Sequence, residues 1–96
     1  MGLGLHVENY LKNIYFLQSR HARVSTSALA ERMGVSAPSV TSMVRKLARM
    51  GLLAHEPYRG VSLTKQGEIT ALKVIRAHRL WELYLVEVVG LSWDQA

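Results

Sequence analysis

The most constraining feature of this sequence is a glycine-centred break between two short helical patterns. The stretch SALAERM, residues 27–33, is followed at once by Gly34, and glycine is a common end signal for helices. Ser36 can cap a further helix just beyond the break, and Pro38 is tolerated in the first turn of that helix. Gly51 is placed to end it. Two helices joined by so short a turn form a helix-turn-helix.

The patterns on either side of this pair complete a winged fold. Apolar residues recur at helical spacing over residues 7–19, which predicts a first amphipathic helix. The stretch RVST before the helix pair fits either a small strand or a helix lead-in, with Ser25 or Thr26 as the cap. Over residues 52–64, the runs LLAHE and VSLT flank PYRG, which predicts a β-hairpin.

A long helical pattern follows the hairpin. Thr64 can cap a helix that extends from about residue 65 to Gly90. We therefore predict a mainly α fold, with a winged helix-turn-helix DNA-binding domain over residues 1–64. The long helix begins a second part, over residues 65–96.

The helix after the break has two chemically different faces. At about 100° per residue, one stripe carries apolar side chains that suit a core: Val40, Met43, Val44 and Leu47. The other face carries hydroxyls toward the start of the helix and cations toward its end: Ser39, Thr41, Ser42, Arg45, Lys46 and Arg49. A helix that enters the major groove uses short side chains at bases and cations at phosphates. A solvated surface helix is the alternative interpretation of this face.

The positive charge lies in the same part of the chain. The net charge is +5; residues 1–64 hold eight cations and three anions, whereas residues 65–96 hold four of each. This asymmetry favours a polyanionic partner for the first part, although a basic solvated surface would look the same. The chain has no cysteine, which fits the cytosol, and it contains neither a signal peptide nor an apolar run of about 18 residues.

The end of the long helix is apolar on most sides. Between Leu80 and Leu91 nearly every side of the predicted helix carries a large apolar residue. Such a helix is buried on most sides, and a winged-helix core covers only one. We therefore predict a homodimer, or cover by a further C-terminal segment; burial within the monomer is the alternative. Two-fold symmetry would place two recognition helices about one DNA turn apart.

Four segments in order resemble the diphtheria toxin repressor family of iron- or manganese-dependent transcriptional repressors: VENYLKNIYFL, LAERMGVSAPSVTSMVRKLARMGLL, EPYRGVSLTKQGE and AHRLWELYLVEVVGLSWDQ. The resemblance spans roughly residues 7–95. It implies a homodimer that binds a palindromic operator when loaded with Mn²⁺ or Fe²⁺. It also places one group of residues near bases or backbone and another at phosphates: Ser36, Ala37, Pro38, Ser39 and Ser42, and then Lys46, Arg49 and Arg59 of the wing.

The resemblance further implies a metal site. His78 and Glu82 match the ligand pair of the long helix, and their i, i+4 spacing turns both side chains the same way. Asn9 stands at the ligand position of the first helix and offers an uncharged oxygen, while Lys12 argues against a two-metal manganese site. Further family ligands lie beyond Ala96, so we expect the site to be incomplete in this chain. A simple hydrogen bond between His78 and Glu82 is the alternative interpretation.

The patterns predict a DNA-binding protein that has no contact with membranes, and the resemblance implies a cytoplasmic, metal-dependent repressor of metal-homeostasis genes. Two alternatives stay open: a metal-independent winged-helix regulator, and a winged helix that binds another protein. No enzyme is expected, because no nucleophile–base pair, phosphate-binding glycine loop or carboxylate cluster stands out. We interpret the remaining histidines as surface residues and the two tryptophans as packing residues: His6, His21, His55, Trp81 and Trp93.

Overall fold

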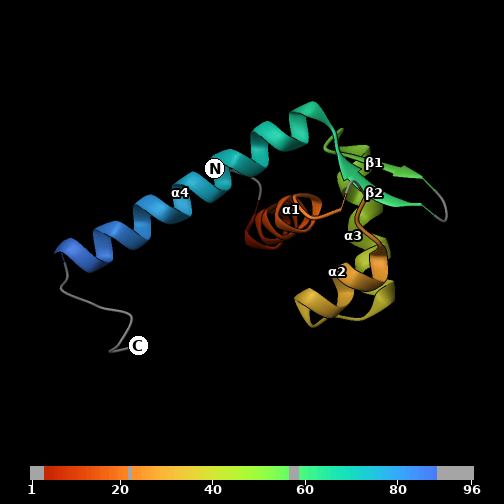
Figure 1. The fold of residues 1–96 in the computed structure, drawn as a ribbon, viewed down its shortest axis with the longest axis horizontal. Coiled ribbons are helices and arrows are strands. Elements are labelled where there is room, and N and C mark those ends of the chain that lie inside the picture. The colour runs from red at the N-terminus through yellow and green to blue at the C-terminus, as the bar shows by residue number, and fades with distance from the viewer. Residues whose placement is uncertain (1–3, 22, 57–58, 89–96) are drawn as a thin grey trace.

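A computed structural model describes residues 4–21, 23–56 and 59–88. Four helices and one hairpin follow one another in the predicted order (Figure 1). Their bounds are α1 Leu5–Gln18, α2 Thr26–Met33, α3 Ala37–Arg49, β1 Leu53–Glu56, β2 Gly60–Leu63 and α4 Lys65–Val88. The mainly helical winged fold is therefore confirmed. None of the described helices is both long and apolar enough to cross a bilayer.

The predicted capping residues hold the helix-turn-helix in place. Ser25, rather than Thr26, caps α2 by accepting a hydrogen bond from the Ala28 backbone N–H at 3.0 Å. Gly34 ends α2 in the left-handed conformation, at φ 67°. Ser36 caps α3 by accepting from the Ser39 backbone N–H. The glycine that ends α2 and the serine that caps α3 are therefore sufficient to separate the two helices.

The wing is a two-stranded antiparallel sheet whose register pairs Leu53 with Leu63 and Glu56 with Gly60. A single residue of the α1–α2 linker extends it: Val24 and Val61 exchange two backbone hydrogen bonds, each 2.8 Å long. The stretch RVST thus contains both a bridge residue and a helix cap. The linker approaches so closely because Gly60 has no side chain; a Cβ there would collide with the Val24 carbonyl.

One hydrophobic core joins α1, α2, α3, the wing and the first half of α4. The predicted apolar stripe of α3 is inside it, with Val40, Val44 and Leu47 fully buried and Met43 partly buried. From the other elements it takes Val7, Tyr10, Leu11, Ile14, Val24, Leu29, Leu52, Leu53, Val61, Leu63 and Ala71. Because the apolar stripe points inward, the opposite face of α3 must point to solvent.

The outer half of α4 extends beyond this core as an arm (Figure 1). Ala71 and Val74 are buried, whereas Leu80, Trp81, Leu83 and Tyr84 are each about half exposed or more, at 49–60%. Trp81 stacks on Tyr84 of the same helix and is 60% exposed, so it packs outside the core of the described residues. Within the described residues, these four side chains are therefore not buried. The predictions for Gly90, Leu91 and Trp93 fall outside the described residues.

Candidate nucleic-acid interface and metal-ligand positions

The polar face of α3 is open to solvent along its whole length. Of the candidate DNA contacts on this helix and at its cap, Thr41 is half-buried and the other eight are exposed. The exposed residues are Ser36, Ala37, Pro38, Ser39, Ser42, Arg45, Lys46 and Arg49. The hydroxyls lie near the start of the helix and the cations near its end. The structure therefore gathers these residues on one continuous surface.

The hydroxyls on this surface are not equally available. Ser36 and Ser39 are bonded to each other in the cap, with their Oγ atoms 2.9 Å apart. The Thr41 hydroxyl donates to the Ala37 carbonyl oxygen at 3.1 Å. Among the described residues, no hydrogen bond occupies the hydroxyl of Ser42. Ser42 therefore retains its full hydrogen-bonding capacity for a ligand.

Hollows on two sides make α3 a projecting ridge. An open groove of about 880 Å³ separates Ser39 and Lys46 of α3 from His6 and Asn9 of α1. Another, of about 600 Å³, is lined by Thr41 and Arg45, among others. Three residues line both hollows: Pro38, Ser42 and Arg49. A ridge of this kind can be inserted into a groove of duplex DNA, whose major groove accepts one α-helix.

Tyr10 of α1 lines the larger groove and also belongs to the hydrophobic core. Its side chain is only 5% exposed, and burial raises the pKa of its hydroxyl above the ordinary value. The Tyr10 hydroxyl is therefore neutral at physiological pH. It adds no negative charge to a surface that would face phosphates.

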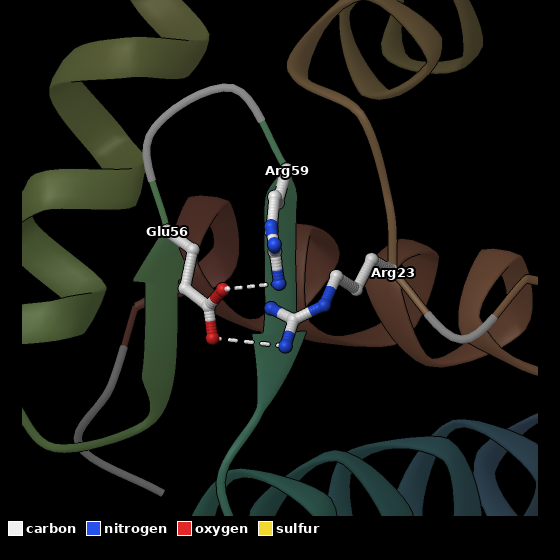
Figure 2. Close-up of polar contacts among 3 residues, drawn as sticks. All are labelled: Arg23, Glu56 and Arg59. Atoms are coloured by element: carbon white, nitrogen blue, oxygen red, sulfur yellow. Dashed lines mark hydrogen bonds and ion pairs between the residues drawn. The ribbon is translucent and has the colours of Figure 1, made fainter.

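The wing carries Arg59, whose side chain is 72% exposed. Figure 2 shows that it shares Glu56 with Arg23, a cation from the α1–α2 linker that our sequence reasoning did not select. The Arg23–Glu56 ion pair is 2.8 Å long, and the Arg59–Glu56 distance is 3.8 Å. Sequence patterns could not reveal Arg23, because it lies far from the wing in the chain.

The candidate metal ligands lie on α1 and α4. His78 is half-buried, and its Nε2 lies 3.9 Å from the Glu8 carboxylate, a residue that the sequence analysis did not select. Glu82 is exposed, and no hydrogen bond joins it to His78 among the described residues. Asn9 is half-buried on α1, next to Glu8 in the sequence.

These residues supply only part of a metal site. Nε2 and Oε1 atoms 3.9 Å apart could both bind one cation, since ligand bonds to such metals are about 2.0–2.2 Å long. No group of three or more His, Cys, Asp or Glu residues in the described ranges could hold a metal ion. The donors of the described part of the chain therefore do not by themselves satisfy Mn²⁺ or Fe²⁺.

Comparisons with known proteins match nearly the whole chain to one family of DNA-binding repressors. Residues 3–61 match the N-terminal DNA-binding domain of iron-dependent repressors, and residues 64–96 match their metal-binding and dimerisation domain. The iron-dependent repressor IdeR of Mycobacterium tuberculosis is 39% identical over 88 residues, which are 92% of this chain and 38% of IdeR. An uncharacterized HTH-type transcriptional regulator of Methanocaldococcus jannaschii is 36% identical over 87 residues, which are 90% of this chain and 70% of the relative.

A solved structure gives the same result in three dimensions. A manganese-dependent transcriptional repressor in complex with manganese superposes with a TM-score of 0.79 at 43% identity. The match covers 93% of this chain and 41% of the solved one. The chain thus spans less than half the length of IdeR and of this manganese-dependent repressor.

Proposed function

The chain belongs to the iron-dependent repressor family, and from this premise we propose that it is a metal-responsive repressor that binds duplex DNA as a homodimer. The observation that carries the proposal is the ridge of α3, whose exposed hydroxyls and cations are backed by an apolar stripe packed into the core. The regulated genes would be those of metal homeostasis, and the site of action would be the cytoplasm. The proposed role is binding alone, without a catalytic step.

We assign each part of the surface a contact. Residues 36–42 would face base edges and the adjacent backbone, through Ser36, Ala37, Pro38, Ser39, Thr41 and Ser42. Arg45, Lys46 and Arg49 on α3, with Arg59 on the wing, would contact phosphates. In this arrangement residues 1–64 form the DNA-binding domain, and residues 65–96 begin the dimerisation and metal-binding domain.

Replacement of the cations on α3 tests the phosphate contacts. Each phosphate contact contributes about one unit to the slope of log affinity against log salt. Lys46→Ala and Arg49→Ala are each expected to weaken binding to all duplex sequences and to flatten that slope by about one. Lys73→Ala, an exposed cation on α4, is the matched control and should leave the slope unchanged. An unchanged slope in the α3 variants would remove these residues from the interface.

For the metal, we propose that His78, Glu82 and Asn9 contribute ligands, with Glu8 beside His78. His78 and the carboxylates are donors that Mn²⁺ and Fe²⁺ accept, and the remaining ligands would come from other parts of the protein. The metal would stabilise the DNA-competent arrangement of the dimer.

Operator binding by the full-length protein, measured with Mn²⁺ or Fe²⁺ and with a chelator, tests the metal response. Tighter binding with metal is expected. Equal affinity in both conditions would favour a metal-independent winged-helix regulator. A complete lack of salt-sensitive affinity for duplex DNA would favour a protein-interaction module instead.

A further inference from the structure

A carboxylate contacts two guanidinium groups beside the turn of the wing (Figure 2). Glu56, the last residue of β1, accepts a hydrogen bond of 2.8 Å from Arg23 through Oε1, and its Oε2 lies 3.8 Å from Arg59 (Figure 2). The two arginines come from segments far apart in the sequence: Arg23 from the α1–α2 linker and Arg59 from the residue just before β2. Nothing in the sequence pattern or in the family assignment gives Arg23 a role.

Backbone bonds fix the positions of all three residues. Arg23 directly precedes Val24, which is held to Val61 of β2 by two hydrogen bonds of 2.8 Å. Glu56 is paired in register with Gly60, and the Arg59 backbone N–H donates to the Glu56 carbonyl oxygen at 3.0 Å. The three side chains therefore meet because the linker and the hairpin are joined through their backbones, and not through a chance approach of mobile side chains.

The trio remains open to solvent. The exposed fractions of the side chains of Arg23, Glu56 and Arg59 are 38%, 45% and 72%. Two guanidinium groups around a single carboxylate leave a net charge of +1. Guanidinium groups bind phosphate oxygens with the same paired N–H donors that they offer to a carboxylate. The position of Glu56 is thus one that a DNA phosphate could take.

We propose that Arg23 and Arg59 form a phosphate contact at the wing, and that Glu56 occupies this contact in the free protein. Glu56 then competes with the DNA backbone and lowers the affinity for duplexes of any sequence. The inference rests on the proposed function, since it needs the wing to lie against DNA. It adds Arg23 to the interface and gives an acidic residue a role in limiting non-specific binding.

The substitution Glu56→Gln tests the competition. Glutamine keeps the size of the side chain but removes its charge, so both arginines become available to phosphate. Because exposed ion pairs are weak, we expect a modest gain in affinity, about two- to fivefold. Arg23→Gln should weaken binding and flatten the salt slope by about one. The gain from Glu56→Gln should shrink when Arg23→Gln is already present.

The measurement uses the full-length protein and a duplex of arbitrary sequence, long enough for two adjacent half-sites, titrated at several KCl concentrations. Glu87→Gln is the matched control, because it removes the same charge from the exposed arm of α4 at the far end of the molecule (Figure 1). Thermal unfolding verifies that each variant is folded. A gain in affinity for Glu56→Gln alone, with a flattened slope for Arg23→Gln, is the expected result.

Three outcomes would overturn the inference. Weaker binding by Glu56→Gln would mean that Glu56 orients the arginines for DNA. A gain in DNA affinity for Glu56→Gln that is no larger than the gain for Glu87→Gln would mean that only the net charge of the protein matters. An unchanged slope for Arg23→Gln would remove Arg23 from the interface. In all three cases the wild-type protein still binds DNA, whereas a wild type without salt-sensitive affinity would contradict the proposed function itself.

Discussion

Ser42 differs from the other hydroxyl residues of α3 in having no hydrogen bond within the described part of the chain. Thr41, its neighbour, already donates to a backbone carbonyl of its own helix. A base edge in the major groove needs a donor or an acceptor that is still available, so these adjacent residues are not equivalent as contacts. Sequence reasoning grouped them, because spacing alone does not show which hydroxyl is occupied.

The substitution Ser42→Ala is expected to lower the preference for the specific site over arbitrary DNA. A lost single base contact is worth about 1 kcal/mol, or roughly fivefold in affinity. Thr41→Val, which removes a hydroxyl that is bonded within the helix, is the comparison and should have the smaller effect. The measurement is the enrichment of duplexes selected from a random pool by each variant. Equal enrichment by Ser42→Ala and the wild type would argue against direct base contact by Ser42.

Gly60 is the residue on which the joint between linker and wing depends. It has φ 92°, and a Cβ would collide with the Val24 carbonyl. Gly60→Ala is expected to cost about 2–4 kcal/mol of unfolding free energy, from backbone strain and displacement of the linker together. Gly34→Ala has a similar φ of 67° but open space around it, so about 1 kcal/mol is expected there. Urea denaturation of both variants measures the difference, and equal losses would contradict the close approach.

At the scale of secondary-structure elements, Gln18 ties the end of α1 to two others. Its Oε1 accepts a hydrogen bond of 2.8 Å from the Leu63 backbone N–H of β2. Its Nε2 donates to the Glu68 carboxylate of α4 at 3.2 Å. The Gln18 amide thus links both the wing and the first turn of α4 to the C-terminal end of α1.

The substitution Gln18→Ala should therefore loosen the wing. Because it leaves the partly buried Leu63 N–H without its acceptor, we expect a loss of about 1–2 kcal/mol in stability. Hydrogen exchange at the Leu63 amide should accelerate more than exchange in α2. Gln66→Ala, at an exposed site on α4, is the control. Unchanged exchange at Leu63 would show that the backbone pairing of β2 suffices without Gln18.

The elements themselves could be predicted from the sequence because their signals are local. Ser36, Gly34 and Thr64 act on residues within one turn, and the apolar stripe of α3 repeats at helical spacing. Two of the unpredicted contacts join positions that are distant in the sequence. Arg23 and Glu56 are 33 residues apart, and Gln18 and Leu63 are 45 apart. Periodicity reveals which face is inward, but it does not show which distant side chain lies opposite.

The whole molecule is elongated, with extents of 47 × 25 × 23 Å. Its wing and the α4 arm lie at opposite ends of the long axis (Figure 1). The DNA-facing surface proposed above and the exposed apolar arm are therefore separate surfaces. A second copy can cover the arm without covering α3.

Charged substitutions on the arm test this division. Leu83→Lys places a charge within the exposed apolar face, where the side chain is now 54% exposed. Because burial of a charge in an interface is costly, the dimer is expected to weaken at least tenfold. Helix content should remain unchanged, because Leu83 is outside the core. Sedimentation measures the dimer, and Lys65→Ala at the root of α4 is the control; an unaltered dimer in Leu83→Lys would exclude this face.

The length of α4 has a mechanical consequence. Its 24 residues form a rod of about 36 Å, anchored at one end by the core and free at the other. In a symmetric pair joined at the free ends, a rotation of about 5° at that joint moves the anchored end of each rod, and the domain attached to it, by about 3 Å. That displacement is close to one base-pair step, about 3.4 Å. A leverage of this size means that a small rotation where the two arms meet shifts each ridge by about one base pair along the DNA.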